Sequence, residues 1–86
     1  MTPEAARATV LRAIAEVAPD ADLATVNVEV PLQEQLDLGS MDFLAVLSAI
    51  AEETGLDIPE RDYPRLAALG TAIDYLVEHT SAEPRG

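Results

Sequence analysis

The chain lacks several residue types that would point to particular chemistries. It has 86 residues and no cysteine, which excludes disulfides and thiolate metal sites. Lysine is also absent, and five arginines stand against 16 acidic residues, for a net charge of −11. Because nucleic acids and anionic membranes attract Lys and Arg, both are poor partners. A protein with a basic surface is the natural partner, although the acids alone would also keep a small domain soluble.

Long apolar runs and a signal peptide are missing too, so we expect no membrane span and a cytoplasmic location. Aromatic residues make up only 3% of the chain, while 49% of it is apolar. The sequence therefore predicts a globular protein with an aliphatic core. The length fits a single domain, 1–86, with 3–80 ordered and 81–86 a frayed tail, and we expect a monomer.

Helix signals divide the chain into three main segments. Thr2 before Pro3 is a good N-cap followed by proline at the first helical position, and Pro19 ends that helix. A second helix is predicted from Ser40 to the glycine at position 55, which suits a left-handed C-terminal residue. The last helix is predicted over 68–80 and lacks the usual hydroxyl cap at its start.

The intervening segments are harder to read. The stretch "ATVNVEV" alternates apolar and polar residues as a strand does, but no second strand is available to pair with it. We therefore predict a long loop over 19–39, fastened to the helices by side chains that include Val28 and Leu32. The stretch "ERDY" predicts a short turn that Pro64 limits. The fold class is all-α: a small bundle of three main helices plus one short helix.

Helical spacing of apolar residues predicts the core. Its expected members are Leu44, Leu47, Ile50, Ile58, Leu66, Ile73 and Leu76. Phe43 either faces outward or covers the loop, and the pattern does not decide between these positions.

Ser40, in the stretch "LDLGSMDFL", has two interpretations. Serine is a favoured helix cap. An exposed serine at a helix start is also accessible to a modifying enzyme, and a phosphodiester there would meet the positive end of the helix. Catalysis by Ser40 is not indicated, because the only histidine is His79 in the last helix and no nucleophile elbow surrounds the serine. The acids near Asp20 lack the rest of a calcium loop, so we predict neither an enzyme nor a metal site.

The segment "LDLGSMDFL…EETGLDIPERDYPRL…AIDYL" resembles the acyl carrier proteins. That resemblance implies an acyl-carrier-like bundle with a long loop between its first and second helices. It also implies that Ser40 carries 4′-phosphopantetheine derived from coenzyme A, whose thiol holds acyl groups as thioesters. The implied partners are a phosphopantetheinyl transferase and acyl-loading, condensing or tailoring enzymes with basic docking patches. The residues expected to contact them are Asp37, Gly39, Met41, Asp42, Glu52, Glu53 and Asp57.

The chain departs from the family pattern at three positions. Gly39 stands where the family usually has an aspartate directly before the serine, and Ala45 and Ala51 replace acids found in members of fatty-acid synthesis. These departures indicate a carrier of a specialised pathway, of secondary-metabolite or polyketide type. The alternatives are an aminoacyl or peptidyl carrier and an unmodified acidic helical adaptor. We also expect the core residues to be able to shelter an acyl chain, although core packing alone explains them.

Overall fold

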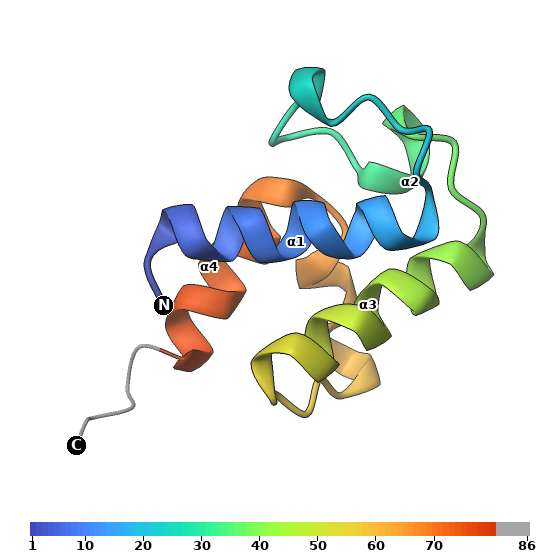
Figure 1. Cartoon of the computed structure of the whole chain (residues 1–86). Coiled ribbons are helices and arrows are strands. Elements are labelled where there is room, and N and C mark those ends of the chain that lie inside the picture. Colours follow the sequence, from blue (N-terminus) through green and yellow to red (C-terminus); the bar gives the residue numbers. More distant parts are fainter. Residues whose placement is uncertain (81–86) are drawn as a thin grey trace.

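The structure, a computed structural model, describes residues 1–80, which fold as a bundle of helices (Figure 1). Three long helices dominate this range: α1 (Pro3–Val17), α3 (Ser40–Thr54) and α4 (Leu69–Thr80). A short helix, α2 (Leu32–Gln35), and two 3-10 turns, η1 (Leu23–Thr25) and η2 (Glu60–Leu66), complete it. The all-α bundle is confirmed. The predicted tail lies outside the described residues, and the single domain over 1–86 stays a prediction.

Helix α1 begins and ends where its sequence signals place it. The Thr2 side chain accepts a hydrogen bond from the Ala5 N–H at 3.1 Å, Pro3 is the first helical residue, and the helix ends at Val17. Its inner face packs against α3 and α4 with small and branched side chains. This face consists of the fully or almost fully buried residues Ala6, Val10, Ala13 and Ile14.

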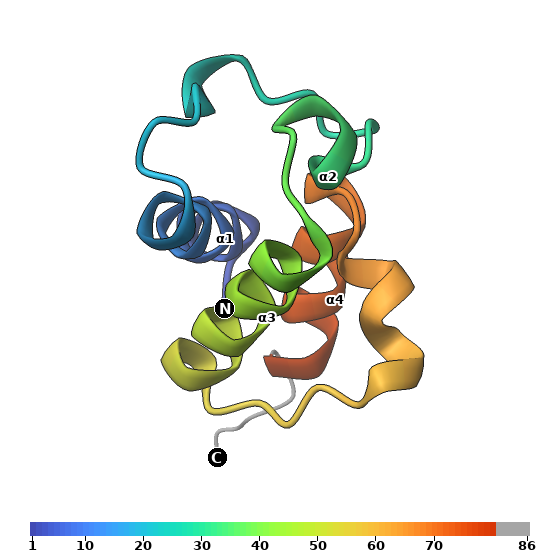
Figure 2. The ribbon, with the colours of Figure 1, turned by 90° about the vertical axis from the view of Figure 1, so that its right-hand side faces the viewer.

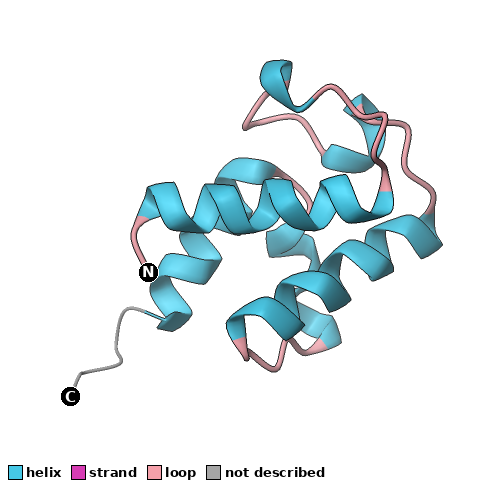
Figure 3. Ribbon diagram, viewed as in Figure 1, coloured by secondary structure: helices cyan, strands magenta, loops and turns pink. Residues whose placement is uncertain are grey.

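The segment between α1 and α3 is a long loop broken by η1 and α2, and Figure 3 shows no strand along the described residues. Its backbone is fastened to the beginning of α4. The Leu32 N–H donates to the Ala67 carbonyl oxygen at 2.7 Å, and the Gly70 N–H donates to the Val28 carbonyl oxygen at 2.9 Å. The Val28 carbonyl oxygen therefore takes the place of the missing hydroxyl cap, because it accepts from an N–H of the first turn of α4. Val28 fastens the loop through its carbonyl, whereas its side chain is 42% exposed, so the prediction that its side chain packs inward is wrong.

Most of the predicted core is buried, but Leu44 is not. Leu47, Ile50, Leu66 and Leu76 are each at most 3% exposed, and Ile58 and Ile73 pack half-buried against them. Leu44 is 45% exposed, so its assignment to the core is wrong. The buried stripe of α3 is instead Phe43, Val46, Leu47 and Ile50. At about 100° per residue, Leu44 falls beside this stripe, and Phe43 occupies the inward position one residue earlier.

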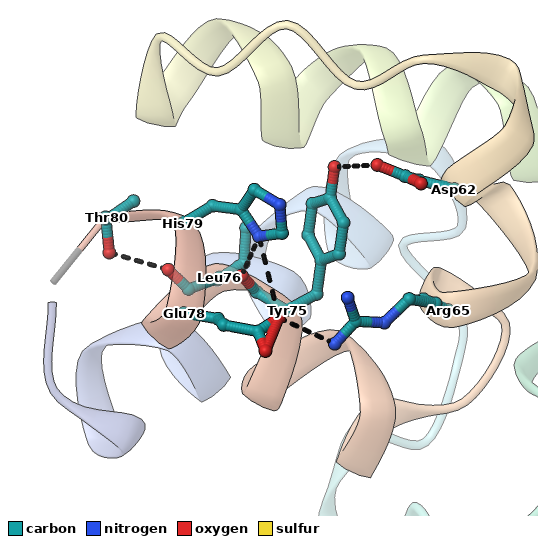
Figure 4. A network of polar contacts seen from close by, with 7 residues as sticks. All are labelled: Asp62, Arg65, Tyr75, Leu76, Glu78, His79 and Thr80. Carbon is teal, nitrogen blue, oxygen red and sulfur yellow. Dashed lines mark hydrogen bonds and ion pairs between the residues drawn. The ribbon is translucent and has the colours of Figure 1, made fainter. Parts of the chain in front are cut away.

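A polar network joins η2 to α4 (Figure 4). The Tyr75 hydroxyl donates to Asp62 Oδ2 at 2.7 Å, and the Arg65 guanidinium lies 5.1 Å from the centre of the Tyr75 ring. Arg65 also pairs with Glu78 at 2.9 Å, and the His79 ring stacks on Tyr75 with 4.0 Å between ring centres. Tyr75 is 1% exposed, and burial together with the Asp62 carboxylate raises the pKa of its hydroxyl to about 12.

Pro64 does not stop η2, which continues to Leu66. Two successive turns explain this. The first closes when the Asp62 N–H donates to the Pro59 carbonyl oxygen at 2.9 Å. The second begins at Pro64, whose carbonyl oxygen accepts from the Ala67 N–H at 3.3 Å. A proline at the start of a turn has no need of an N–H, so η2 runs two residues past Pro64 before it ends at Leu66.

Candidate functional site

Ser40 is the first residue of α3 and is exposed. The N-cap position belongs to Gly39, whose backbone is extended with φ −77° and ψ 173°. The interpretation of Ser40 as the capping residue is therefore wrong by one position. No hydrogen bond of the Ser40 hydroxyl is found within residues 1–80, so this oxygen is available for chemistry.

The beginning of α3 presents unpaired donors around this serine. The first hydrogen bond along the helix is donated by Phe43 N–H to the Gly39 carbonyl oxygen, at 3.0 Å. The N–H groups of Ser40, Met41 and Asp42 precede it and have no partner in the described part of the chain. Asp42 reaches back and accepts from the Gly39 N–H at 3.3 Å. The helix start thus combines a free hydroxyl with backbone donors that favour an anion.

The turn before Ser40 is held by a left-handed residue. Asp37 has φ +56°, the one non-glycine residue with a positive φ within the described range. It follows α2, and the Leu38 N–H donates back to the Gln33 carbonyl oxygen at 3.1 Å, which is the pattern of a Schellman motif. Leu38 is only 8% exposed, so its side chain anchors the chain in the core two residues before Ser40. The sequence offered no glycine to reveal this motif.

Exposed apolar side chains lie on α3 beside the serine. Met41 is 80% exposed and Leu44 is 45% exposed, although each is large enough to pack in a core. Leu44 lies one turn after Ser40, so the two share a side of the helix. This apolar surface is available to a partner protein.

The acids expected to contact partners differ in whether they already form contacts within the bundle. Asp37, Asp42, Glu52 and Asp57 are exposed. Glu53 forms an ion pair with Arg12 of α1 and accepts a hydrogen bond from Thr9 at 3.3 Å. The Arg12 hydrogen bond is the main reason that the pKa of Glu53 is lowered. Glu53 therefore links α1 to α3, and its charge is partly engaged within the bundle.

Neither a metal cluster nor a membrane helix is found within residues 1–80. These residues hold no group of three or more His, Cys, Asp and Glu side chains placed to bind a metal ion. None of their helices has the length and apolar content that a bilayer crossing requires.

Comparison with known proteins bears directly on this serine-bearing helix start. The family described as the phosphopantetheine attachment site matches residues 8–75 of the chain, which include Ser40 and all of α3. The chain belongs to this phosphopantetheine-attachment family. Its members are carriers rather than catalysts, so this chain is a carrier protein whose prosthetic group is 4′-phosphopantetheine. Carrier proteins receive that group from phosphopantetheinyl transferases.

Relatives of this carrier protein are distant in sequence. An acyl carrier protein of Rubrobacter xylanophilus is 29% identical over 79 residues, covering 88% of this chain and 98% of that protein. A mitochondrial acyl carrier protein of Arabidopsis thaliana is 29% identical over 62 residues, covering 72% of this chain and 49% of that protein. An acyl carrier protein of Lactobacillus johnsonii is 28% identical over 58 residues, covering 67% of this chain and 72% of that protein.

Proposed function

We propose that Ser40 carries the 4′-phosphopantetheine arm, and that the protein holds acyl intermediates on it as thioesters in a specialised biosynthetic pathway. One observation carries the proposal. Ser40 is exposed at the first position of α3, and its hydroxyl makes no hydrogen bond with the described residues. The residues around it fit the group, because a phosphodiester on this oxygen would lie beside the free N–H groups of the first turn.

The modification needs little from the carrier beyond presentation of this oxygen. Ser40 Oγ attacks the coenzyme A phosphorus that bears the pantetheine arm, and its proton passes to a base of the transferase. A new P–O bond forms, the bond between the two phosphates breaks, and adenosine 3′,5′-bisphosphate leaves. The attached thiol supplies the thioester linkage for the cargo. The chain's own contribution is a rigid helix start, anchored by Leu38 and by the Asp42 contact with Gly39.

The exposed acids from the turn before α3 to the segment after it support recognition by partner enzymes. Asp37, Asp42, Glu52 and Asp57 supply negative charge for a basic docking patch, and Met41 supplies an exposed apolar contact. Glu53 remains a weaker candidate because it is paired with Arg12. Gly39 leaves the backbone before Ser40 open to a transferase.

A specialised pathway is favoured by the charge of α3. Ala45 is exposed and Ala51 half-buried at two positions where the resemblance to fatty-acid-synthesis carriers leads us to expect acids. The docking face is therefore less acidic than that of such a carrier. The cytoplasmic location and the monomeric state remain predictions, as does the shelter of an acyl chain by the core.

Mass spectrometry of the intact protein tests the attachment residue. Wild type incubated with a promiscuous phosphopantetheinyl transferase, coenzyme A and Mg²⁺ should gain one phosphopantetheine, and Ser40→Ala should gain none. Ser48→Ala is the matched control, because Ser48 is also exposed on α3 and its loss should leave the modification unchanged. Modification of Ser40→Ala would refute the assignment. An unmodified wild type under several transferases would favour the acidic adaptor.

The cargo is tested separately once the arm is attached. Loading by acyltransferases, with no loading by enzymes that adenylate amino acids, is the expected result. Aminoacylation of the arm with no acyl transfer would instead make the protein an aminoacyl or peptidyl carrier.

A further inference from the structure

Val28 is an exposed apolar residue that the proposed attachment site does not use. Its side chain is 42% exposed, and it lies in the loop before α2. Met41 and Leu44 are exposed beside Ser40, where a partner that acts on the arm would meet them. Val28 instead lines a groove at the beginning of α4, which we call the α4 groove. Its lining residues are Val28, Glu29, Ala68, Gly70, Thr71, Ile73 and Asp74.

The floor of the α4 groove is fixed by backbone contacts. Gly70 N–H donates to the Val28 carbonyl oxygen, and Pro31 pairs with Ala68 in a single antiparallel bridge. Figure 2 shows this part of the loop lying against the segment that leads into α4. Gly70 keeps the two backbones close, because a Cβ there would come within 3.1 Å of the Val28 oxygen. The groove is therefore formed before any partner arrives.

The loop wall of the groove is also held in shape by side chains. The Gln35 amide nitrogen donates to the carbonyl oxygens of Asn27 and Val30, at 2.8 and 2.9 Å, and its oxygen accepts from the Asn27 N–H. The Glu29 N–H donates to the Asn27 side chain at 2.9 Å. These hydrogen bonds hold Asn27 and Glu29, the two residues that flank Val28. They therefore fix the loop in the conformation in which the Val28 side chain is exposed.

The charged residues that line the α4 groove are all acidic. Glu29 and Asp74 are exposed among its lining residues, and no arginine or histidine is among them. Val28 and the half-buried Ile73 supply the apolar surface. An apolar floor between acids complements an apolar side chain flanked by cations.

We propose that the α4 groove is a second docking surface, which binds a segment of a partner protein that places an apolar side chain between arginines or lysines. The apolar side chain covers Val28 and Ile73, and the cations meet Glu29 and Asp74. This surface is separate from Ser40, so a partner can hold the carrier there while the arm reaches an active site. Such a contact raises the local concentration of the arm without adding contacts at the serine.

A pair of synthetic peptides provides the probe. Acetyl-Arg-Leu-Arg-Leu-Arg-amide and the same peptide with serine in place of leucine are titrated into the ¹⁵N-labelled full chain and followed by amide chemical shifts. The leucine peptide should shift the amides of Val28, Glu29, Gly70 and Thr71. It should bind about tenfold more tightly than the serine peptide, because a leucine side chain leaves water.

Two variants separate the apolar and charged parts of the groove. Val28→Ser keeps the backbone bond to Gly70 and should remove the preference for leucine. Glu29→Lys/Asp74→Lys should weaken binding about tenfold through loss of attraction and added repulsion. The control is Glu16→Lys/Asp20→Lys, which reverses two other exposed acids and makes the same change in net charge. It should leave the affinity within about twofold of wild type.

The proposal is overturned if both peptides bind equally, if the shifts concentrate on α3, or if the control double variant weakens binding as much as the groove variant does. Unchanged leucine preference in folded Val28→Ser would also overturn it. The groove variants should still gain phosphopantetheine at Ser40. A chain that binds the leucine peptide but is never modified would refute the proposed function and leave the groove intact.

Discussion

The hydrogen bond from the Tyr75 hydroxyl to Asp62 links the short turn η2 to α4, and substitution of Tyr75 tests how much this bond contributes to stability. Tyr75→Phe removes the hydroxyl and leaves the ring, so the contacts with His79 and Arg65 remain. A hydrogen bond to a charged group contributes about 1.5–3 kcal/mol. Asp62 is half-buried and can recover part of this from water. We therefore expect Tyr75→Phe to lower the free energy of unfolding at pH 7 by about 1.5 kcal/mol.

The raised pKa of Tyr75 adds a second measurement. The hydroxyl has a pKa of about 10 when unfolded and about 12 in the native protein. Between these values the unfolded chain loses the proton that the native protein keeps, so wild-type stability falls as the pH rises. The fall is about 1.4 kcal/mol per pH unit between pH 10 and 12, and stability from this group is complete below pH 10. Tyr75→Phe lacks this loss, so the difference of about 1.5 kcal/mol at pH 7 should vanish near about pH 11 and reverse in sign toward pH 12.

Urea denaturation followed by circular dichroism at pH 7, 9, 10, 11 and 12 measures both effects. Tyr63→Phe is the control, because the Tyr63 hydroxyl has no hydrogen-bond partner in the described chain, and its stability should stay close to wild type at pH 7. A difference between wild type and Tyr75→Phe below about 0.5 kcal/mol at pH 7 would contradict the proposed contribution of the bond. A difference that stays constant from pH 9 to 12 would contradict the assignment of the raised pKa.

Three further predictions concern α3 and the turn before it. Gly39→Asp restores the acid that the family resemblance leads us to expect before the serine, so initial-rate mass spectrometry should show faster phosphopantetheinylation. The side chain has room, since a Cβ there meets nothing closer than Asp42 Oδ2 at 3.9 Å. An unchanged or slower rate would contradict this. Asp37→Gly should raise the free energy of unfolding by about 0.5–1 kcal/mol, because glycine adopts φ +56° without a side-chain penalty; a loss of stability in urea would show that the carboxylate holds the turn. Leu47→Ala should cost about 2–5 kcal/mol in the same assay and Leu44→Ala less than about 1 kcal/mol, and equal costs would place Leu44 in the core after all.

Features set by neighbouring residues were predictable from the sequence. Thr2 and Pro3 mark the start of α1 because both act within the first turn, and Gly55 ends α3 with φ +76° for the same local reason. The start of α3 was predicted at the correct residue, although the capping role belongs to Gly39. The family resemblance supplied the long loop, which local pattern alone could not explain.

Features that depend on distant residues were not predictable. Helix α2 has four residues, too few to be stable alone, and it is held by contacts with the start of α4. The ion pair of Arg12 with Glu53 joins residues 41 positions apart. Nothing in the sequence indicates that either residue finds a partner. The inward position of Phe43 likewise depends on the packing of the whole bundle, because Phe43 joins a core to which residues far apart in the sequence contribute.

The one-residue difference between a capping serine and a serine just inside the helix has a chemical consequence. A serine at the N-cap turns its hydroxyl to accept from an N–H of the first turn, which engages the oxygen that a modifying enzyme needs. With Gly39 at the cap there is no side chain to do this, and the Asp42 carboxylate accepts from the Gly39 N–H instead. The helix start is therefore stabilised from within α3, while Ser40 Oγ stays free. Glycine before the serine is thus compatible with attachment for a structural reason, even though it removes the acid expected there.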